Sequence, residues 1–133
     1  MRQTQSLAHE ALLELPHGNP VCGLAFVGEE RLVSASGPEV SVWGLNPPRL
    51  VSRIYTATSV ATSLDVSPDG RYAVLREGGD YQLAVVYDLR RPRAEVVLRP
   101  GGMIRGARFS GARRVVTDGA DLLQWDLAWL EAK

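Results

Sequence analysis

The sequence predicts an all-β fold in which three similar four-stranded antiparallel sheets follow one another along the chain. The main observation is a strand–turn–strand pattern that occurs three times. Its first strands lie at 24–26, 64–66 and 107–109, so the copies are 40 and 43 residues apart. Gly or Pro stands where each copy must reverse, as in the Ser-Pro-Asp-Gly turn at 67–70. Strands such as 21–27 are apolar throughout, which is typical of a sheet covered on both faces.

The three copies contain the same elements in the same order. The first strand and its turn lead to a second strand, at 32–35, 72–75 and 115–117. A polar loop then leads to a third strand that ends in an aromatic residue, at 40–43, 84–87 and 122–125. Between consecutive copies lies a β-rich segment that we assign to a fourth strand, at 50–55 and 94–99.

The equivalent slot before the first copy holds residues 11–15. Spacing alone would allow an amphipathic helix here, because Leu7, Leu12 and Leu15 lie near one face and the segment is rich in helix formers. The position in the repeat favours a strand, because the segments in the two later slots are clearly β-rich. We therefore expect a leading strand at 11–15, after a flexible segment over residues 1–9.

The ends of the third strands carry the signature of a family. Trp125-Asp126, Tyr87-Asp88 and Trp43-Gly44 occupy equivalent positions. Together with the period and the turn at 67–70, they make the chain resemble the WD-repeat (tryptophan–aspartate) β-propeller family, in which about 40–45 residues form one four-stranded blade. The resemblance implies a three-blade unit over residues 10–133, with repeats at about 10–45, 49–89 and 93–127.

One part of the family pattern is missing. The Gly-His dipeptide that usually precedes the innermost strand occurs in none of the three repeats, and His17-Gly18 has the reverse order. The resemblance therefore does not predict the Asp–His–Ser/Thr–Trp hydrogen-bond network of strong family members for any of the three blades.

The order of the strands predicts association. With strands named a to d from the centre of a propeller to its rim, the chain begins with an unpaired d strand and ends with a blade that lacks one. Three blades cannot close a ring of about four to eight, and an open arc exposes apolar faces and a strand edge. We expect the leading strand of one chain to pair with the last strand of another, through Leu12, Leu13, Leu15, Leu122, Leu123 and Trp125.

Several assemblies would complete the ring. A homodimer would have six blades, which fits the usual range, and a homotrimer would have nine, which exceeds it. A complementary propeller chain could also supply the missing blades. The remaining alternative is that this sequence is part of a longer propeller.

The resemblance also assigns the loops to two faces. The d–a and b–c loops lie on the face that is conventionally the top, and the a–b and c–d turns lie on the bottom. The top receives mostly acidic side chains and the bottom mostly arginines. Our hypothesis is that the top binds a basic peptide segment of a partner protein, and the alternative is that these are ordinary solvated turns. The candidate partner-binding residues are His17, Asn19, Glu39, Glu77, Asp80, Asp118 and Asp121.

Composition and motifs argue against other classes of function. The net charge of +0 gives no general attraction to nucleic acid or an anionic membrane, so we expect neither as a partner. His9 and His17 have no Cys or His at metal-ligand spacing, and the sequence has no nucleophile elbow, phosphate loop or dinucleotide fingerprint. We therefore expect no catalytic residue, metal or cofactor. The expected location is the cytoplasm, with the nucleus as the alternative.

Two functions of different classes follow. The favoured one is a non-catalytic protein–protein interaction scaffold that presents its loops to partner proteins. The alternative is a propeller whose central channel binds a small ligand or performs hydrolysis. An enzyme would gather several His, Asp or Glu side chains around one point, whereas a scaffold would not.

Overall fold

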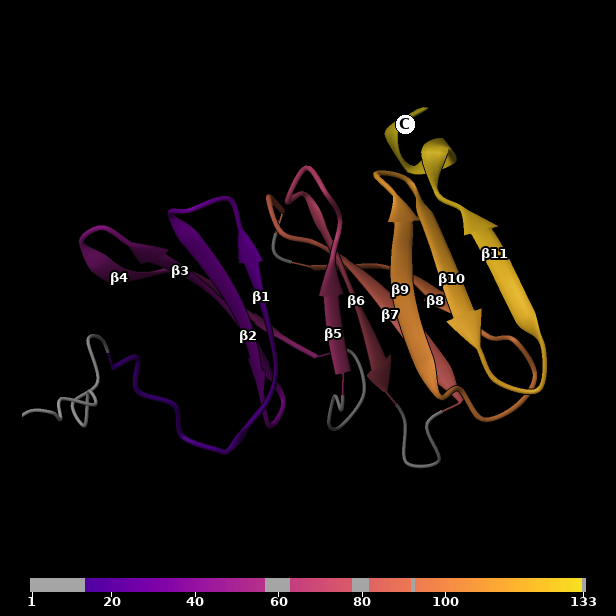
Figure 1. The fold of residues 1–133 in the computed structure, drawn as a ribbon, viewed down its shortest axis with the longest axis horizontal. Helices are drawn as coiled ribbons and strands as arrows, with labels where there is room; N and C mark the ends of the chain where they lie inside the picture. Colours follow the sequence, from indigo (N-terminus) through magenta and orange to yellow (C-terminus); the bar gives the residue numbers. More distant parts are fainter. Residues whose placement is uncertain (1–13, 57–62, 78–81, 92, 133) are drawn as a thin grey trace, which may run out of the picture.

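The computed structural model describes residues 14–56, 63–77, 82–91 and 93–132. They form three antiparallel sheets that stand side by side in chain order (Figure 1). This confirms the all-β class and the three repeats. No helix in the described ranges has the length and apolar character needed to cross a membrane.

The strand bounds follow the predicted elements closely. The first sheet contains β1 (Val21–Val27), β2 (Arg31–Ser36), β3 (Glu39–Leu45) and β4 (Pro48–Tyr55) in that order. The second contains β5 (Ser63–Val66), β6 (Tyr72–Glu77), β7 (Leu83–Asp88) and β8 (Arg93–Leu98). The third contains β9 (Gly106–Gly111), β10 (Arg114–Asp118) and β11 (Leu122–Asp126), and a short 3-10 helix, η1 (Ala128–Ala132), follows. This sheet has three strands, as expected for a last blade without its own outer strand.

The turn between β5 and β6 shows how these hairpins are fixed. Ser67 donates its hydroxyl hydrogen to the Asp69 carboxylate at 2.7 Å and accepts a hydrogen bond from the Tyr72 backbone at 3.0 Å. Gly70 donates its backbone N–H to the Ser67 carbonyl at 2.8 Å and has a φ of 75°, a value that favours glycine. The Ser-Pro-Asp-Gly turn predicted from the sequence is therefore a closed, rigid hairpin turn.

The leading strand predicted at 11–15 is not found in the part that the structure describes. Residues 11–13 lie outside the described ranges, and Glu14 and Leu15 belong to no strand. The Leu15 carbonyl instead accepts a hydrogen bond of 2.7 Å from Nδ1 of His17. This hydrogen bond from His17, together with Pro16, which has no backbone N–H, turns the stretch toward the first sheet.

Two hydrophobic clusters join the three sheets. The first lies between sheets one and two and includes Val33, Val85 and Tyr87, which are fully buried. The second lies between sheets two and three and includes Val86 and Val115. Val85 and Val86 are neighbours on β7 but point to opposite faces, so the middle sheet is covered on both sides.

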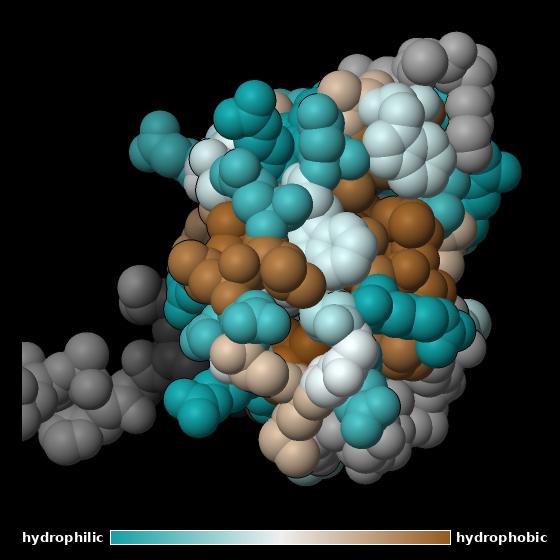
Figure 2. All heavy atoms as spheres, turned by 90° about the vertical axis from the view of Figure 1, so that its right-hand side faces the viewer, coloured by the Kyte–Doolittle hydropathy of each residue, from teal (hydrophilic) through white to brown (hydrophobic). Residues whose placement is uncertain are grey.

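The two end sheets each leave one face uncovered among the described residues. On the first sheet, Leu24 and Phe26 of β1 are 59% and 67% exposed. On the third sheet, Leu122 is 75% exposed beside the polar Gln124 and Arg108. Figure 2 looks at this end of the molecule and shows hydrophobic groups separated by hydrophilic ones. The end sheets therefore differ in character from the buried sheet between them.

Candidate functional site

The loops predicted to form the top face lie together along the lower edge of Figure 1. The described ones are the approach to β1, the β2–β3 and β10–β11 turns, and the loop between β8 and β9. The last two pack against each other in the third blade. Each predicted partner-binding residue that the structure describes can therefore be placed on this face or within the sheets.

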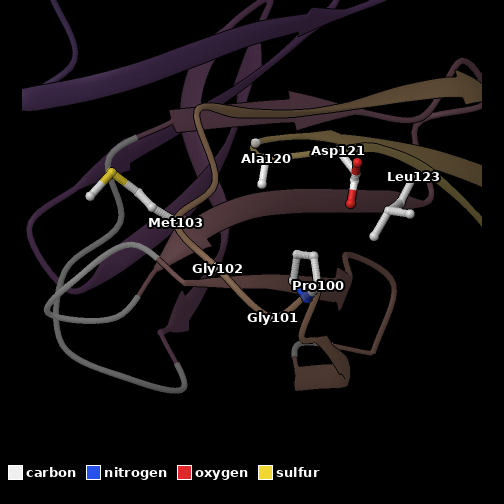
Figure 3. Close-up of a pocket in the computed structure, with 8 residues that line it drawn as sticks. Pro100, Gly101, Gly102, Met103, Ala120, Asp121 and Leu123 are labelled. Atoms are coloured by element: carbon white, nitrogen blue, oxygen red, sulfur yellow. The ribbon is translucent and has the colours of Figure 1, made fainter.

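A hollow of about 100 Å³ lies between these two loops of the third blade. The β8–β9 loop contributes residues 100–103, and the β10–β11 turn contributes residues 119–121 together with Leu123. Figure 3 shows Asp121 and Leu123 on one side of this hollow and Pro100 on the other. This part of the predicted top face is therefore concave.

The two loops hold each other through backbone contacts. Arg105 donates its backbone N–H to the Asp118 carbonyl at 2.6 Å. Gly119 lies so close to the neighbouring loop that a Cβ at this position would sit 2.4 Å from the Met103 carbonyl oxygen. Arg76 of β6 donates from Nη1 to the carbonyls of Ile104 and Arg105, at 3.0 and 2.7 Å. The hollow is thus anchored to the middle blade as well as to its own.

The chemistry around the hollow is both acidic and apolar. Asp118 and Asp121 are exposed on the turn, and Met103 is 61% exposed on the facing loop. Arg99 and Arg105 are also exposed on this loop, so the surface is less uniformly acidic than the sequence suggested. The sequence signal for the close approach of the two loops is Gly119, where a side chain would strike the neighbouring loop.

His17 and Asn19 take part in hydrogen bonds within the first blade. Trp43 donates from Nε1 to the Ser34 hydroxyl at 3.0 Å, and Ser34 donates to Nε2 of His17 at 2.8 Å. The rings of His17 and Trp43 lie 5.3 Å apart. The Asn19 carbonyl accepts a 2.6 Å hydrogen bond from Ser36. The resemblance did not predict the family's hydrogen-bond network for any blade, yet its His–Ser–Trp part forms in the first blade despite the reversed dipeptide.

Glu77 is also inside the protein, which corrects its assignment to an exposed loop. It is fully buried, and its carboxylate accepts a hydrogen bond from the hydroxyl of Tyr87. The reason is that β6 continues through Glu77, which pairs with Leu83 of β7. In the third blade the equivalent aromatic, Trp125, donates from Nε1 to Thr117 at 3.0 Å. In each blade the aromatic at the end of the third strand thus takes an acceptor from the second strand.

The remaining predicted top-face residues differ in their surroundings. Glu39 is half-buried and forms an ion pair with Arg53 across β3 and β4, at 3.5 Å. Asp80 lies outside the described residues. The exposed acids that the structure brings together are Asp118 and Asp121.

The described residues among those expected to close the ring differ in their exposure. Leu12 and Leu13 lie outside the described residues, and Leu15 is half-buried. Leu122 is exposed, whereas Leu123 lines the hollow and Trp125 packs against the second hydrophobic cluster. Within the described ranges, no group of three or more His, Cys, Asp or Glu side chains is placed to hold a metal ion.

Comparison with known proteins finds a similarity in fold. No protein-family model matches the chain, and no curated protein matches it. Among solved structures, it is similar to the structure of U3-55K and to the crystal structure of the RRP9 WD40 repeats. Each has a TM-score of 0.70 and 15% sequence identity, over 86% of this chain. The chain spans only 38% of the length of either structure.

Proposed function

Because the chain has the fold of WD40-repeat propeller blades, we propose that it is a non-catalytic scaffold for protein–protein interaction. The observation that supports this most directly is the hollow of the third blade. It combines the exposed carboxylate of Asp121, an exposed Met103 and loops held rigidly by Gly119 and Arg76, and the exposed Asp118 stands next to it at the end of β10. A preorganised surface loses little conformational entropy on binding, which favours recognition.

The chemistry of this surface favours a basic peptide segment with an apolar side chain. The carboxylates of Asp118 and Asp121 attract Lys or Arg, and Met103 offers an adaptable apolar contact. The alternative remains that both acids are ordinary solvated turn residues. The two explanations make opposite predictions for a charge-neutralising substitution.

The test is fluorescence anisotropy with a labelled peptide made of three lysines and one leucine. The double variant Asp118→Asn/Asp121→Asn should weaken binding by about twofold to thirtyfold at low salt, because each lost exposed ion pair is worth about 0.2–1 kcal/mol. The matched control is Glu29→Gln/Glu30→Gln, which removes two exposed acids from the opposite face. Equal affinity for both double variants would refute the proposed site.

We also propose that the functional form is a closed ring assembled from more than one chain. The support is that Leu24 and Phe26 at one end and Leu122 at the other are exposed on sheet faces that neighbouring blades would cover. A homodimer, a homotrimer or a complementary propeller chain would satisfy this requirement. Native mass spectrometry of the purified chain distinguishes them, and a clean monomer over a broad concentration range would refute self-assembly.

A further inference from the structure

A second hollow lies between the first two blades, on the face opposite the predicted top face. Its volume is about 280 Å³. The β1–β2 and β3–β4 ends bound it on one side, and the β5–β6 and β7–β8 turns bound it on the other, along the upper edge of Figure 1. We call it the interblade cleft. It shares no residue with the hollow of the third blade.

The walls of the interblade cleft are apolar and fixed. Val27, Val51 and Leu89 line it from two different blades. One end is closed where the turn of the second blade seats on the first, so closely that a Cβ on Gly70 would lie 2.4 Å from Cγ1 of Val27. A ligand for this space must therefore carry an apolar group that fits between two rigid hairpins.

Two arginines from different blades stand at its rim. Arg31 begins β2, and Arg90 lies in the turn after β7. In the described part of the chain, no acidic side chain pairs with either guanidinium. Asp88, the nearest acid in sequence to Arg90, is instead paired with Arg71 and Arg91.

The acid that lines the cleft is already neutralised by the third blade. Asp69 forms an ion pair of 2.8 Å with Arg113 and accepts a hydrogen bond from Ser67. Its charge is therefore directed away from Arg31 and Arg90, which remain available for an anion from outside. Guanidinium groups bind carboxylates in a paired, planar geometry.

A buried hydroxyl adds a specific polar contact. The Ser52 oxygen on β4 is shielded from solvent and has no hydrogen-bond partner among the described residues. Ser52 lines the cleft. Buried polar groups almost always find a partner, and a group bound in the cleft would provide one.

We infer that the interblade cleft binds an extended segment of a partner protein through a Glu or Asp side chain next to an aliphatic one. The carboxylate lies between Arg31 and Arg90, the aliphatic side chain packs on Val27 and Leu89, and Ser52 bonds to the segment. The inference needs a protein partner, as the scaffold function does, but it uses a different face and chemistry.

Two observations favour this ligand over others. Glu29 and Glu30 directly precede Arg31 in the β1–β2 turn, so a doubly charged phosphate meets more repulsion beside Arg31 than a carboxylate does. Val51, which lines the cleft from β4, is 41% exposed, and β4 is an edge strand of its sheet. A peptide chain can cover Val51 and pair with this edge, whereas a small free acid cannot.

The test compares two labelled peptides that are blocked at both ends, Leu-Glu-Leu-Val and Leu-Gln-Leu-Val, against the full chain. The Glu peptide should bind at least tenfold more tightly than the Gln peptide, and added salt should reduce the difference. Equal binding would overturn the inference without the use of any variant. A free 4-methylpentanoate that binds as tightly as the Glu peptide would overturn the assignment to a peptide.

Variants locate the site. Arg31→Gln and Arg90→Gln should each weaken binding of the Glu peptide by about fivefold to tenfold. The control Arg114→Gln changes an exposed arginine on the same face but in the third blade, and it should leave this binding unchanged. Ser52→Ala should weaken binding without lowering the thermal midpoint, because its hydroxyl has no partner to lose. If Arg114→Gln reduces binding as much as Arg31→Gln, the site is not the cleft. Binding of the lysine-rich peptide should stay unchanged in all of these variants, so failure here is separable from failure of the loop-face site.

Discussion

The hydrogen-bond chain of the first blade makes a sharp prediction for Ser34→Ala. Ser34 is 2% exposed and links Trp43, itself 5% exposed, to His17. Without the hydroxyl, the buried Trp43 N–H loses its acceptor, which costs about 1–3 kcal/mol. The half-buried His17 ring can recover water, so its share is smaller, about 0.5–1 kcal/mol. The expected loss in the free energy of unfolding is therefore about 1.5–4 kcal/mol.

Thermal and urea unfolding at one fixed protein concentration measure this loss, because association would otherwise shift the result. For a chain of this size the thermal midpoint should fall by about 6–15 °C. Ser110→Ala is the matched control, since Ser110 is exposed and accepts only one hydrogen bond, of 3.1 Å, from Gln124. Adding Trp43→Phe to Ser34→Ala should cost less than the sum of the two single changes. A Ser34→Ala midpoint equal to that of Ser110→Ala would refute the reasoning.

Three further predictions concern the other blades. Trp125→Ala should lower the free energy of unfolding by about 3 kcal/mol, measured by urea unfolding, because a half-buried aromatic leaves the second cluster. Gly119→Ala should lower the free energy of unfolding by about 1–3 kcal/mol and weaken binding of the lysine-rich peptide, because the new Cβ would strike the Met103 carbonyl. Burial raises the pKa of Asp69, but hydrogen bonds from Ser67 and the Arg71 backbone and the charge of Arg113 outweigh this and hold it below 3.8. Asp69→Asn should therefore destabilise the protein at pH 7, with the difference disappearing as acid titration passes below that pKa.

The repeat could be predicted from the sequence because each of its signals is local. Gly70 and the residues around it determine a turn by themselves, and the aromatic residues at 43, 87 and 125 end strands at the same phase of a regular period. Apolar strands covered on both faces leave few other ways to pack. The strand order and the shortened third sheet follow from this counting alone.

The candidate site could not be predicted in the same way, because its residues meet only in three dimensions. Glu77 looked like a loop acid, yet Tyr87 holds it inside the middle blade. His17 precedes a glycine instead of following one, and the approach to β1 still delivers its ring to Trp43. The interblade cleft joins Arg31 to Arg90 across two repeats, and no spacing along the chain indicates that meeting.

The free face of the third blade has a consequence for whatever adjoins it. Gln124 stands where the first two blades carry the buried valines Val42 and Val86, and Arg108 lies on the same face. A neighbour with a purely apolar surface would bury these donors and acceptors without hydrogen-bond partners. The adjoining surface must therefore offer a hydrogen-bond partner to each of these groups, so this end of the arc selects its neighbour by the positions of polar groups. The Leu24–Phe26 end instead binds through buried apolar area.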